Sequence, residues 1–285
     1  MEQNNQEQTG IGKGIGRHKY EFLKQIPKTE LTDLQRHQIV EYENRAAPMT
    51  AEQIAANKEY FKRIREKSDD DVKEVKITAE QLYKVFKSDF FEVNKREYVH
   101  NDETKRNLQP IIFYLTKDDR FFQCQNLRKD LSEPSFLKGL LVIGNFGNGK
   151  SAAFKTLAHV LRQVKGFSFK TYTANQVVGM FEQCADESER REFERIMYGG
   201  RVYFDDVKTE RIASKFGKVN VFKDIIEERY NNKALTYITC NFAEGFPGDT
   251  QKALDEFEFK YGGRVYDRLF EMFNIVEFHG KSFRK

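Results

Sequence analysis

The apolar positions of this chain follow two kinds of repeat. Short apolar or alternating runs, which are typical of β-strands, occur at 140–143, 167–172, 201–204, 235–239 and 275–278. Longer runs with apolar residues at helical spacing predict helices over 151–164, 173–184, 187–196, 219–230, 251–259 and 264–273. Because the strands alternate with helices, we predict an α/β domain with a mainly parallel five-stranded sheet.

Before residue 140 the apolar spacing is helical. The sequence Thr-Ala-Glu-Gln occurs at 50–53 and again at 78–81, and in both places it predicts a capping box that opens a helix. A third helix is predicted over 101–115, and Pro110 is expected to kink or end it. The apolar stripe of the first helix contains Ile54, Tyr60, Phe61 and Ile64, and that of the second contains Leu82, Val85 and Phe86.

These patterns divide the chain into three parts. Residues 1–20 are polar, with glycines and basic residues, and we predict a disordered basic tail. Residues 21–100 form a small helical region, which either binds a partner protein or DNA or packs as an accessory subdomain. Its basic residues beside Tyr60 suit a nucleic-acid backbone, although such a run is also typical of a solvated helix face. Residues 101–285 are predicted to form the α/β domain.

The segment that follows the strand at 140–143 contains the motif that is most informative about function. This segment fits the pattern G-x-x-x-x-G-K-[ST] of a phosphate-binding loop. Glycines let the backbone wrap around phosphate oxygens, and the helix that follows adds the positive end of its dipole. Lys150 is expected to reach the β- and γ-phosphates, and Ser151 to bind Mg²⁺. The predicted nucleotide-binding residues are Gly144, Asn145, Phe146, Gly147, Asn148, Gly149, Lys150 and Ser151.

A second candidate is the pair of carboxylates after the strand at 201–204. Asp205 lies 55 residues after Lys150 (205 − 150). Since parallel strands end at one edge of a sheet, both aspartates are expected beside the phosphate-binding loop. Asp205 is predicted to hold Mg²⁺ through water, and Asp206 to orient and polarise the attacking water. The alternative is a turn that two aspartates open.

Asn241 follows the strand at 235–239 and is a third candidate. If this strand lies beside the one at 140–143, the Asn241 side chain would face the γ-phosphate and could contact it or the attacking water. Asparagine at a strand end is also a common turn residue, so the spacing leaves both readings open.

Arg264 and Arg268 lie at positions i and i+4 of the last predicted helix, on one face. Arginine forks match phosphate oxygens bidentately. If this helix packs at the far side of the sheet, neither arginine reaches its own loop, and the nucleotide of a neighbouring subunit is the natural target. This is the arginine-finger arrangement. The alternative is a surface pair bonded to Asp267 or Glu271.

Composition narrows the class of protein. The chain has 285 residues, 39% hydrophobic and 32% charged, enough for one substantial core and a smaller appended region. No apolar run approaches the roughly 18 residues of a membrane span, and the first residues lack the order of a secretory signal, so we expect a cytoplasmic protein without a membrane partner. The three widely spaced cysteines predict neither disulfides nor a zinc site. A net charge of +4 is compatible with nucleic acid but does not require it.

The motifs taken together resemble a known family. In chain order they read GNFGNGKS, YFDDVKTE, YITCNF, YGGRVYDRLFEMF and EFHGKSFRK. This order is similar to that of DnaC/DnaI-type replicative helicase loaders, which belong with the IstB-like AAA+ ATPases, and the resemblance runs from about residue 107 onward. It implies a P-loop AAA+ core without the usual C-terminal lid. Lys208 stands where the family commonly has glycine, and the first hundred residues match no pattern of the family.

The resemblance also implies a function. A protein of this family would bind ATP and Mg²⁺, assemble into an oligomer with ATP, contact single-stranded DNA and deliver a hexameric replicative helicase to DNA. By motif position, Lys150 and Ser151 match Walker A, Asp205 and Asp206 Walker B, Asn241 the first sensor, and Arg264 and Arg268 the finger box, without deciding which arginine reaches across.

Three other functions stay open from the sequence. An IstB-like helper of a transposase would have the same ATPase core. A nucleotide-dependent DNA-binding scaffold that barely hydrolyses ATP is suggested by Asp206, because many AAA+ enzymes have glutamate at that position. A small-molecule kinase is disfavoured, because no acceptor pocket is evident and the arginine pair implies a neighbouring subunit.

Overall fold

The computed structural model describes residues 17–27, 29–46, 77–214 and 217–283. The chain divides into two compact units, residues 1–73 and residues 74–285. The predicted helix that the capping box at 50–53 would open lies outside the described residues, as does most of the predicted basic tail.

The described part of the first unit consists of two helices, α1 (Arg17–Lys24) and α2 (Asp33–Ala46), which contact each other. Leu23 and Leu31 are buried in this unit. An ion pair joins Lys24 Nζ to Glu43 Oε1 at 2.6 Å. Helix α1 therefore begins inside the segment for which we predicted a disordered tail.

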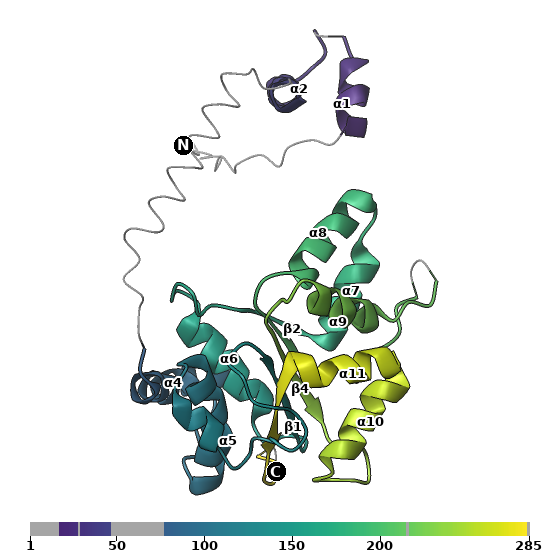
Figure 1. Cartoon of the computed structure of the whole chain (residues 1–285). Coiled ribbons are helices and arrows are strands. Elements are labelled where there is room, and N and C mark those ends of the chain that lie inside the picture. Colours follow the sequence, from purple (N-terminus) through teal and green to yellow (C-terminus); the bar gives the residue numbers. More distant parts are fainter. Residues whose placement is uncertain (1–16, 28, 47–76, 215–216, 284–285) are drawn as a thin grey trace. The chain divides into compact units, whose positions relative to one another are not determined.

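The second unit is built on one five-stranded parallel sheet (Figure 1). The strand order is β2-β3-β4-β1-β5. Strand β1 pairs with β4 on one side and with the edge strand β5 on the other. This arrangement confirms the predicted fold class. The strands are β1 (Gly139–Gly144), β2 (Lys170–Thr173), β3 (Val202–Asp205), β4 (Thr236–Asn241) and β5 (Phe273–Phe278).

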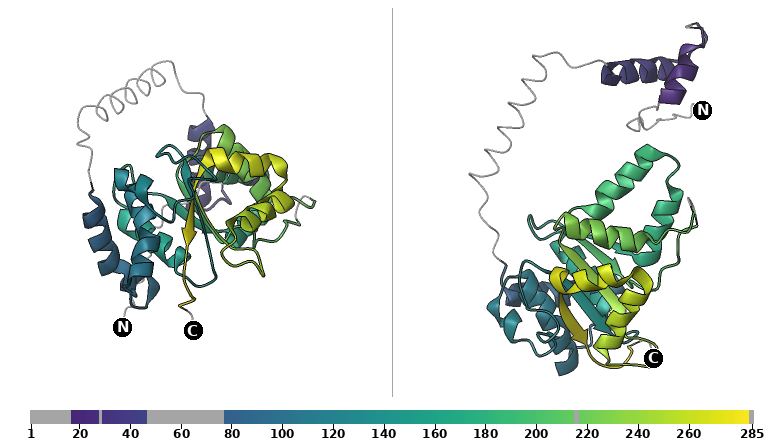
Figure 2. Two further views of the ribbon diagram at one scale, coloured as in Figure 1. Left: turned by 60° about the horizontal axis from the view of Figure 1, so that its bottom comes forward. Right: turned by 45° about the vertical axis from the view of Figure 1, so that its right-hand side comes forward.

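Helices cover both faces of this sheet (Figure 2). Leu140 and Val142 of β1 pack on one side and Leu141 and Ile143 on the other, because successive side chains of a strand point to opposite faces. A strand buried on both faces is apolar throughout, which is why 140–143 reads as a continuous run. One layer contains α4 (Ala79–Asn94), α5 (Asp102–Leu115) and α6 (Lys150–Leu161), and the other contains α7 (Ala174–Gln183), α8 (Glu187–Tyr198), α9 (Val221–Asn231), α10 (Thr250–Tyr261) and α11 (Gly263–Met272).

Helix α4 packs against α6 and α5, in the same compact unit as the sheet, although we predicted a domain boundary near residue 100. Its buried face consists of Leu82, Phe86 and Phe90. The prediction that Val85 belongs to this face is wrong, since Val85 is 43% exposed. The residues at 82, 86 and 90 repeat every four positions, which places them on one side of the helix. This packing brings α4 close to the start of α6.

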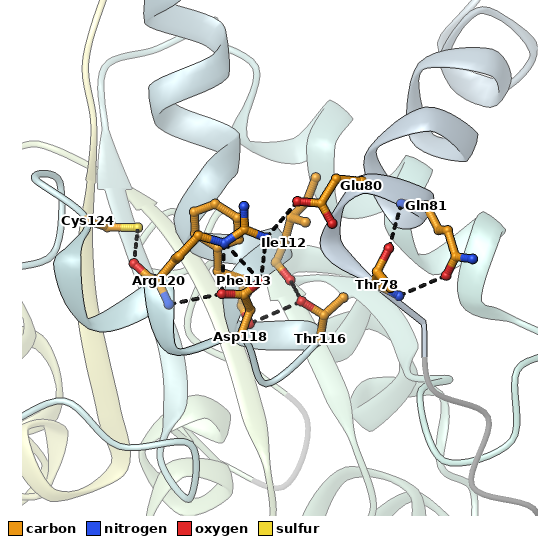
Figure 3. A network of polar contacts seen from close by, with 9 residues as sticks. All are labelled: Thr78, Glu80, Gln81, Ile112, Phe113, Thr116, Asp118, Arg120 and Cys124. Carbon is orange, nitrogen blue, oxygen red and sulfur yellow. Dashed lines mark hydrogen bonds and ion pairs between the residues drawn. The ribbon is translucent and has the colours of Figure 1, made fainter.

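The start of α4 is tied to the segment that follows α5 (Figure 3). Thr78 and Gln81 form the predicted capping box, with the Thr78 N–H donating to Gln81 Oε1 at 2.9 Å and the Gln81 N–H to Thr78 Oγ1 at 3.2 Å. Arg120, in the short 3-10 helix η1 (Asp119–Gln123), donates to Glu80 at 2.7 Å and also to Asp118. Its hydrogen bonds hold the pKa values of both carboxyls below their usual range.

Pro110 does not end helix α5, which continues to Leu115. Proline inside a helix costs about 3 kcal/mol, because it lacks an N–H and crowds the preceding turn. The residues that follow, Ile111, Ile112 and Leu115, are all buried against the sheet layer. Burial of side chains of this size offsets a cost of that order, so tertiary packing outweighs the local preference.

Candidate functional site

The carboxyl ends of β1, β3 and β4 meet at a polar cavity of about 90 Å³. Since β4 lies between β1 and β3, the predicted loop, the two aspartates and Asn241 come together from three separate parts of the sequence. The cavity is lined by Arg96, Phe146, Gly147, Asn148, Gly149, Lys150, Ser151, Ala152, Asp205, Asp206, Thr239 and Asn241.

The backbone of the loop needs glycine at three positions. Gly147 and Gly149 have φ angles of +72° and +97°, in the left-handed region that favours glycine. A Cβ at Gly144 would lie 2.6 Å from both Asn148 Nδ2 and the Phe278 carbonyl oxygen, so no side chain fits there. Gly149 is also the N-cap of α6 and supplies no side-chain cap, which leaves the first N–H groups of this helix available to an anion.

The Lys150 side chain is buried at the floor of this loop, with 6% of the residue exposed. Its Nζ donates to the carbonyl oxygens of Gly144 at 2.7 Å and Asn145 at 2.8 Å. It also donates to Asn241 Oδ1 at 3.1 Å, and Asn148 Oδ1 lies at 3.3 Å. These oxygens hold the ammonium group at one place beside the helix N-terminus, so two positive features face the same cavity.

Three hydroxyl groups converge on one oxygen of Asp205. Its Oδ1 accepts from Ser151 Oγ at 2.7 Å, from the Tyr203 hydroxyl at 2.6 Å and from Thr239 Oγ1 at 2.8 Å. Burial, and then the charge of Asp205, raise the pKa of Tyr203 well above its usual value, so this hydroxyl stays a donor. Among the described residues, Oδ2 accepts no hydrogen bond, so the protein holds this carboxylate through one of its two oxygens.

We predict that Tyr203→Phe weakens the metal-dependent part of nucleotide binding. The variant removes one donor to Asp205 but keeps the ring, which stacks on Phe154 with centroids 4.3 Å apart. A hydrogen bond to a charged group is worth about 1.5–3 kcal/mol, so affinity in Mg²⁺ should fall by about tenfold or more. Titration of a fluorescent ATP analogue with Mg²⁺, and again with EDTA, measures this effect. An equal loss in both conditions would show that Tyr203 acts through the loop instead.

Asn241 connects Lys150 to Asp206. Its Nδ2 donates to Asp206 Oδ1 at 2.7 Å, while its Oδ1 accepts from Lys150. The sequence argument for Asn241 required its strand to lie beside the strand at 140–143. The structure has this arrangement, because β4 pairs with β1 and Asn241 lies opposite Gly144. Asp206 has a φ of +60°, a conformation that aspartate tolerates better than most residues, and its N–H donates to Thr239 Oγ1 at 3.2 Å.

A second, mostly apolar cavity of about 200 Å³ adjoins the polar one and shares Arg96, Asn148 and Gly149 with it. We did not predict this cavity from the sequence. Its walls come from α4, from the 96–99 segment, from α5 and from Phe283, whose N–H donates to the Gly147 carbonyl at 3.0 Å. The only feature of the sequence that pointed to this cavity was the stripe of apolar residues on α4. Such a stripe is equally typical of a helix that packs on a core. The lining residues include Phe86, Phe90, Tyr98, Val99, Leu108 and Ala153.

The two arginines of α11 differ in environment. Arg264 is exposed, whereas Arg268 is 8% exposed and its guanidinium lies 4.3 Å from the ring centre of Tyr230. Within the described chain, Arg268 Nη1 is buried without a hydrogen-bond partner. Neither arginine lines either cavity. The prediction that one of them reaches the nucleotide of a neighbouring subunit concerns a second copy of the chain and stays a prediction.

The residues at the polar cavity fit a magnesium–phosphate group. Mg²⁺ is usually held by one or two carboxylates together with phosphates and water, not by a full protein cage. The Ser151 hydroxyl donates a hydrogen bond to Asp205, so its oxygen keeps lone pairs for a cation. In the described chain, no group of three or more histidine, cysteine or carboxylate side chains forms a metal site of another kind. No described helix is both long and apolar enough to cross a membrane.

Comparison with known proteins gives structural matches only. No protein-family model and no curated protein matches the chain. The structure is similar to the crystal structure of the DnaC helicase loader, with a TM-score of 0.47 and 21% identity over 67% of this chain and 98% of that one. It is also similar to DnaI, with a TM-score of 0.44 and 18% identity over 67% of this chain and 94% of that one.

A third match is AMPPCP-bound DnaA from Aquifex aeolicus, with a TM-score of 0.41 and 14% identity over 73% of this chain and 52% of that one. DnaC and DnaI are the proteins whose motif order this sequence resembles. At identities of this size the likeness concerns the fold alone.

Proposed function

We propose that this protein is an ATPase that binds ATP with Mg²⁺ at the polar cavity and hydrolyses it. The observation that carries the proposal is the link from Lys150 through Asn241 to Asp206, with Ser151 and Asp205 beside it. A phosphate-binding cation, a metal-binding pair and a carboxylate that can orient water lie around one space. Phosphoryl transfer needs little more than such positioning and charge stabilisation.

Each group has a role in the proposed reaction. The N–H groups at the start of α6 and Lys150 bind the phosphates. Ser151 and Asp205 would hold Mg²⁺, which would offset the phosphate charge. Asp206 orients the attacking water. Asn241 fixes the distance between Lys150, which binds the phosphates, and Asp206, because its amide contacts both side chains.

The adjoining apolar cavity suits the base and ribose of a nucleotide. It lies directly beside the loop and shares Asn148 and Gly149 with the polar cavity. A nucleotide is polar at the phosphates and aromatic at the base, and the two cavities differ in polarity in the same order. Phe90 and Tyr98, with ring centroids 5.1 Å apart, offer aromatic surface there.

We further propose that the protein loads a hexameric replicative helicase onto single-stranded DNA, as the motif order implies. In this proposal copies of the chain assemble with ATP, and an arginine of α11 completes the site of the adjoining copy. The helical N-terminal region is the proposed docking region for the partner or DNA. Pull-down with hexameric replicative helicases in ATP and ADP tests this reading, and failure to bind any of them in every nucleotide state would refute it.

An IstB-like helper of a transposase is the alternative function. The ATPase core would be the same, so the partner has to distinguish the two. Filaments on DNA seen by electron microscopy, together with binding to a transposase instead of a helicase, would support the alternative.

Asp206→Asn tests hydrolysis itself. We predict that this variant keeps ATP affinity within a few-fold and loses turnover by about a hundredfold or more, because the amide is a poor acceptor for the proton of water. Phosphate release with single-stranded DNA present measures turnover. Turnover that is negligible in the wild type and unchanged in Asp206→Asn would instead identify a nucleotide-dependent DNA-binding scaffold.

A further inference from the structure

Lys208 occupies an unusual position just after Asp205, the last residue of β3, and Asp206. Its φ angle is +82°, a conformation that glycine adopts freely and lysine does not. Its side chain is nevertheless 8% exposed, so the ammonium group lies inside the protein and not in solvent. A buried lysine at a strained backbone position calls for specific partners.

One partner belongs to the proposed ATP site. Lys208 Nζ donates to the carbonyl oxygen of Asn241 at 2.9 Å. The side chain of the same asparagine touches Lys150 and Asp206. Asn241 is therefore held by its backbone from one side, while its amide meets the groups that face the phosphates. One residue, Asn241, thus contacts both Lys208 and the groups at the polar cavity.

The other partners belong to α10. Lys208 Nζ donates to the Ala253 carbonyl at 3.1 Å and pairs with Glu256 Oε2 at 2.6 Å, and it lies 5.5 Å from the centre of the Phe257 ring. The Lys208 N–H also donates to the Tyr261 hydroxyl at 3.2 Å. These contacts run along the middle and the end of the helix, so they fix its position along its length.

Helix α10 leads directly into the helix that carries the arginines. α10 ends at Tyr261, Gly262 is the junction, and α11 begins at Gly263. α10 and α11 contact each other, so they form a helical pair and not two independent elements. A displacement of α10 relative to β4 would therefore move Arg264 and Arg268.

We propose that Lys208 is a positioning residue that couples Asn241 to the α10–α11 pair, so that the nucleotide bound by one copy sets the position of the arginines it offers to the next. The inference rests on the proposed ATPase function. Lys208 lines neither cavity. It acts through Asn241 on one side and through Glu256 and the Ala253 carbonyl on the other.

The test compares deuterium uptake of residues 250–272 with a non-hydrolysable ATP analogue and with ADP. In the wild type we expect uptake to differ between the two nucleotides. In Lys208→Met, which keeps the aliphatic chain and loses the ammonium, we expect this difference to disappear. Nucleotide affinity should stay within about threefold while kcat falls about tenfold or more, the pattern of an interaction outside ground-state binding. A difference that persists in Lys208→Met would overturn the proposal.

Two control variants separate the ammonium link from general packing. Lys260 also joins α10 to this loop, through the carbonyl oxygens of Lys208 and Glu210, but it does not contact Asn241. Lys260→Met should therefore keep the nucleotide-dependent difference, and its loss there would overturn the role of the Asn241 contact. Lys208→Gly relieves the backbone strain without restoring the ammonium, so it should behave like Lys208→Met. A normal response in Lys208→Gly would assign the effect to loop conformation.

If Lys208→Met does not fold, Glu256→Gln at a half-exposed position on α10 weakens the same link, and an unchanged response in that variant would overturn the proposal. Wild-type protein that binds no nucleotide would refute the ATPase function and the coupling together. Wild-type protein that binds both nucleotides but shows no difference in α10 and α11 would refute the coupling alone.

Discussion

Lys150→Ala is expected to weaken ATP binding by about a hundredfold or more, the largest effect on affinity of any single substitution in this chain. The variant removes the ammonium group that the Gly144 and Asn145 carbonyls hold beside the start of α6. Each charge-assisted hydrogen bond to phosphate contributes about 1.5–3 kcal/mol, so the loss of two corresponds to an effect of that size or greater. Calorimetric titration with ATP and Mg²⁺ measures it directly.

Lys155→Ala is the matched control, because Lys155 lies on the exposed side of the same helix. It removes the same charge from the protein without touching the loop, and its affinity should equal that of the wild type. Near-normal binding by Lys150→Ala would mean that the polar cavity does not bind the triphosphate. The metal and water roles assigned to Asp205 and Asp206 would then have no basis.

Substitution of the α11 arginines is expected to have the largest effect on turnover. Replacement of the arginine that reaches the neighbouring site should lower kcat by about a thousandfold while ATP binding persists. Arg264 is exposed, whereas Arg268 is buried in its own chain, so the effect is expected first in Arg264→Ala. Arg268→Ala should in addition lower thermal stability, because Arg268 is buried against Tyr230.

Mixing experiments identify the arginine that acts between copies. One kind of subunit keeps the phosphate-binding loop but lacks the α11 arginine, and the other is Lys150→Ala with both arginines intact. A mixture of the two should recover part of the turnover that each variant has lost. Arg191→Ala, an exposed arginine on α8 paired with Glu187, is the control and should change nothing. If neither Arg264→Ala nor Arg268→Ala recovers activity on mixing, the protein hydrolyses ATP without help from a second copy.

Much of the fold could be predicted because its signals are local. A strand buried on both faces has to be apolar at every position, and 140–143 shows this without ambiguity. The loop after it needs glycines for close approach, as the contact distances at Gly144 confirm. The ends of two predicted helices differ from the structure: the helix expected to reach Val164 ends at Leu161, and α5 continues past Pro110.

Other features depend on contacts between distant parts of the chain. Val85 and Phe86 are adjacent and both apolar, but only packing against α6 decides that Phe86 is buried and Val85 is not. The apolar cavity beside the loop needs α4, α5 and Phe283 together, and no short stretch of sequence contains that combination. The contacts of Lys208 are likewise absent from the sequence, which shows only a lysine where the family that it resembles commonly has glycine.

The sequence by itself determined the sheet class, the phosphate-binding loop and the identity of the polar groups at the strand ends, because hydrophobic periodicity and glycine requirements act over a few neighbouring residues. Only the tertiary structure decided that Asn241 lies between Lys150 and Asp206, that Arg268 is buried while Arg264 is exposed, and that Lys208 joins the site to α10. Strand order and helix packing set those distances, and both arise from the burial of surfaces far apart in the chain.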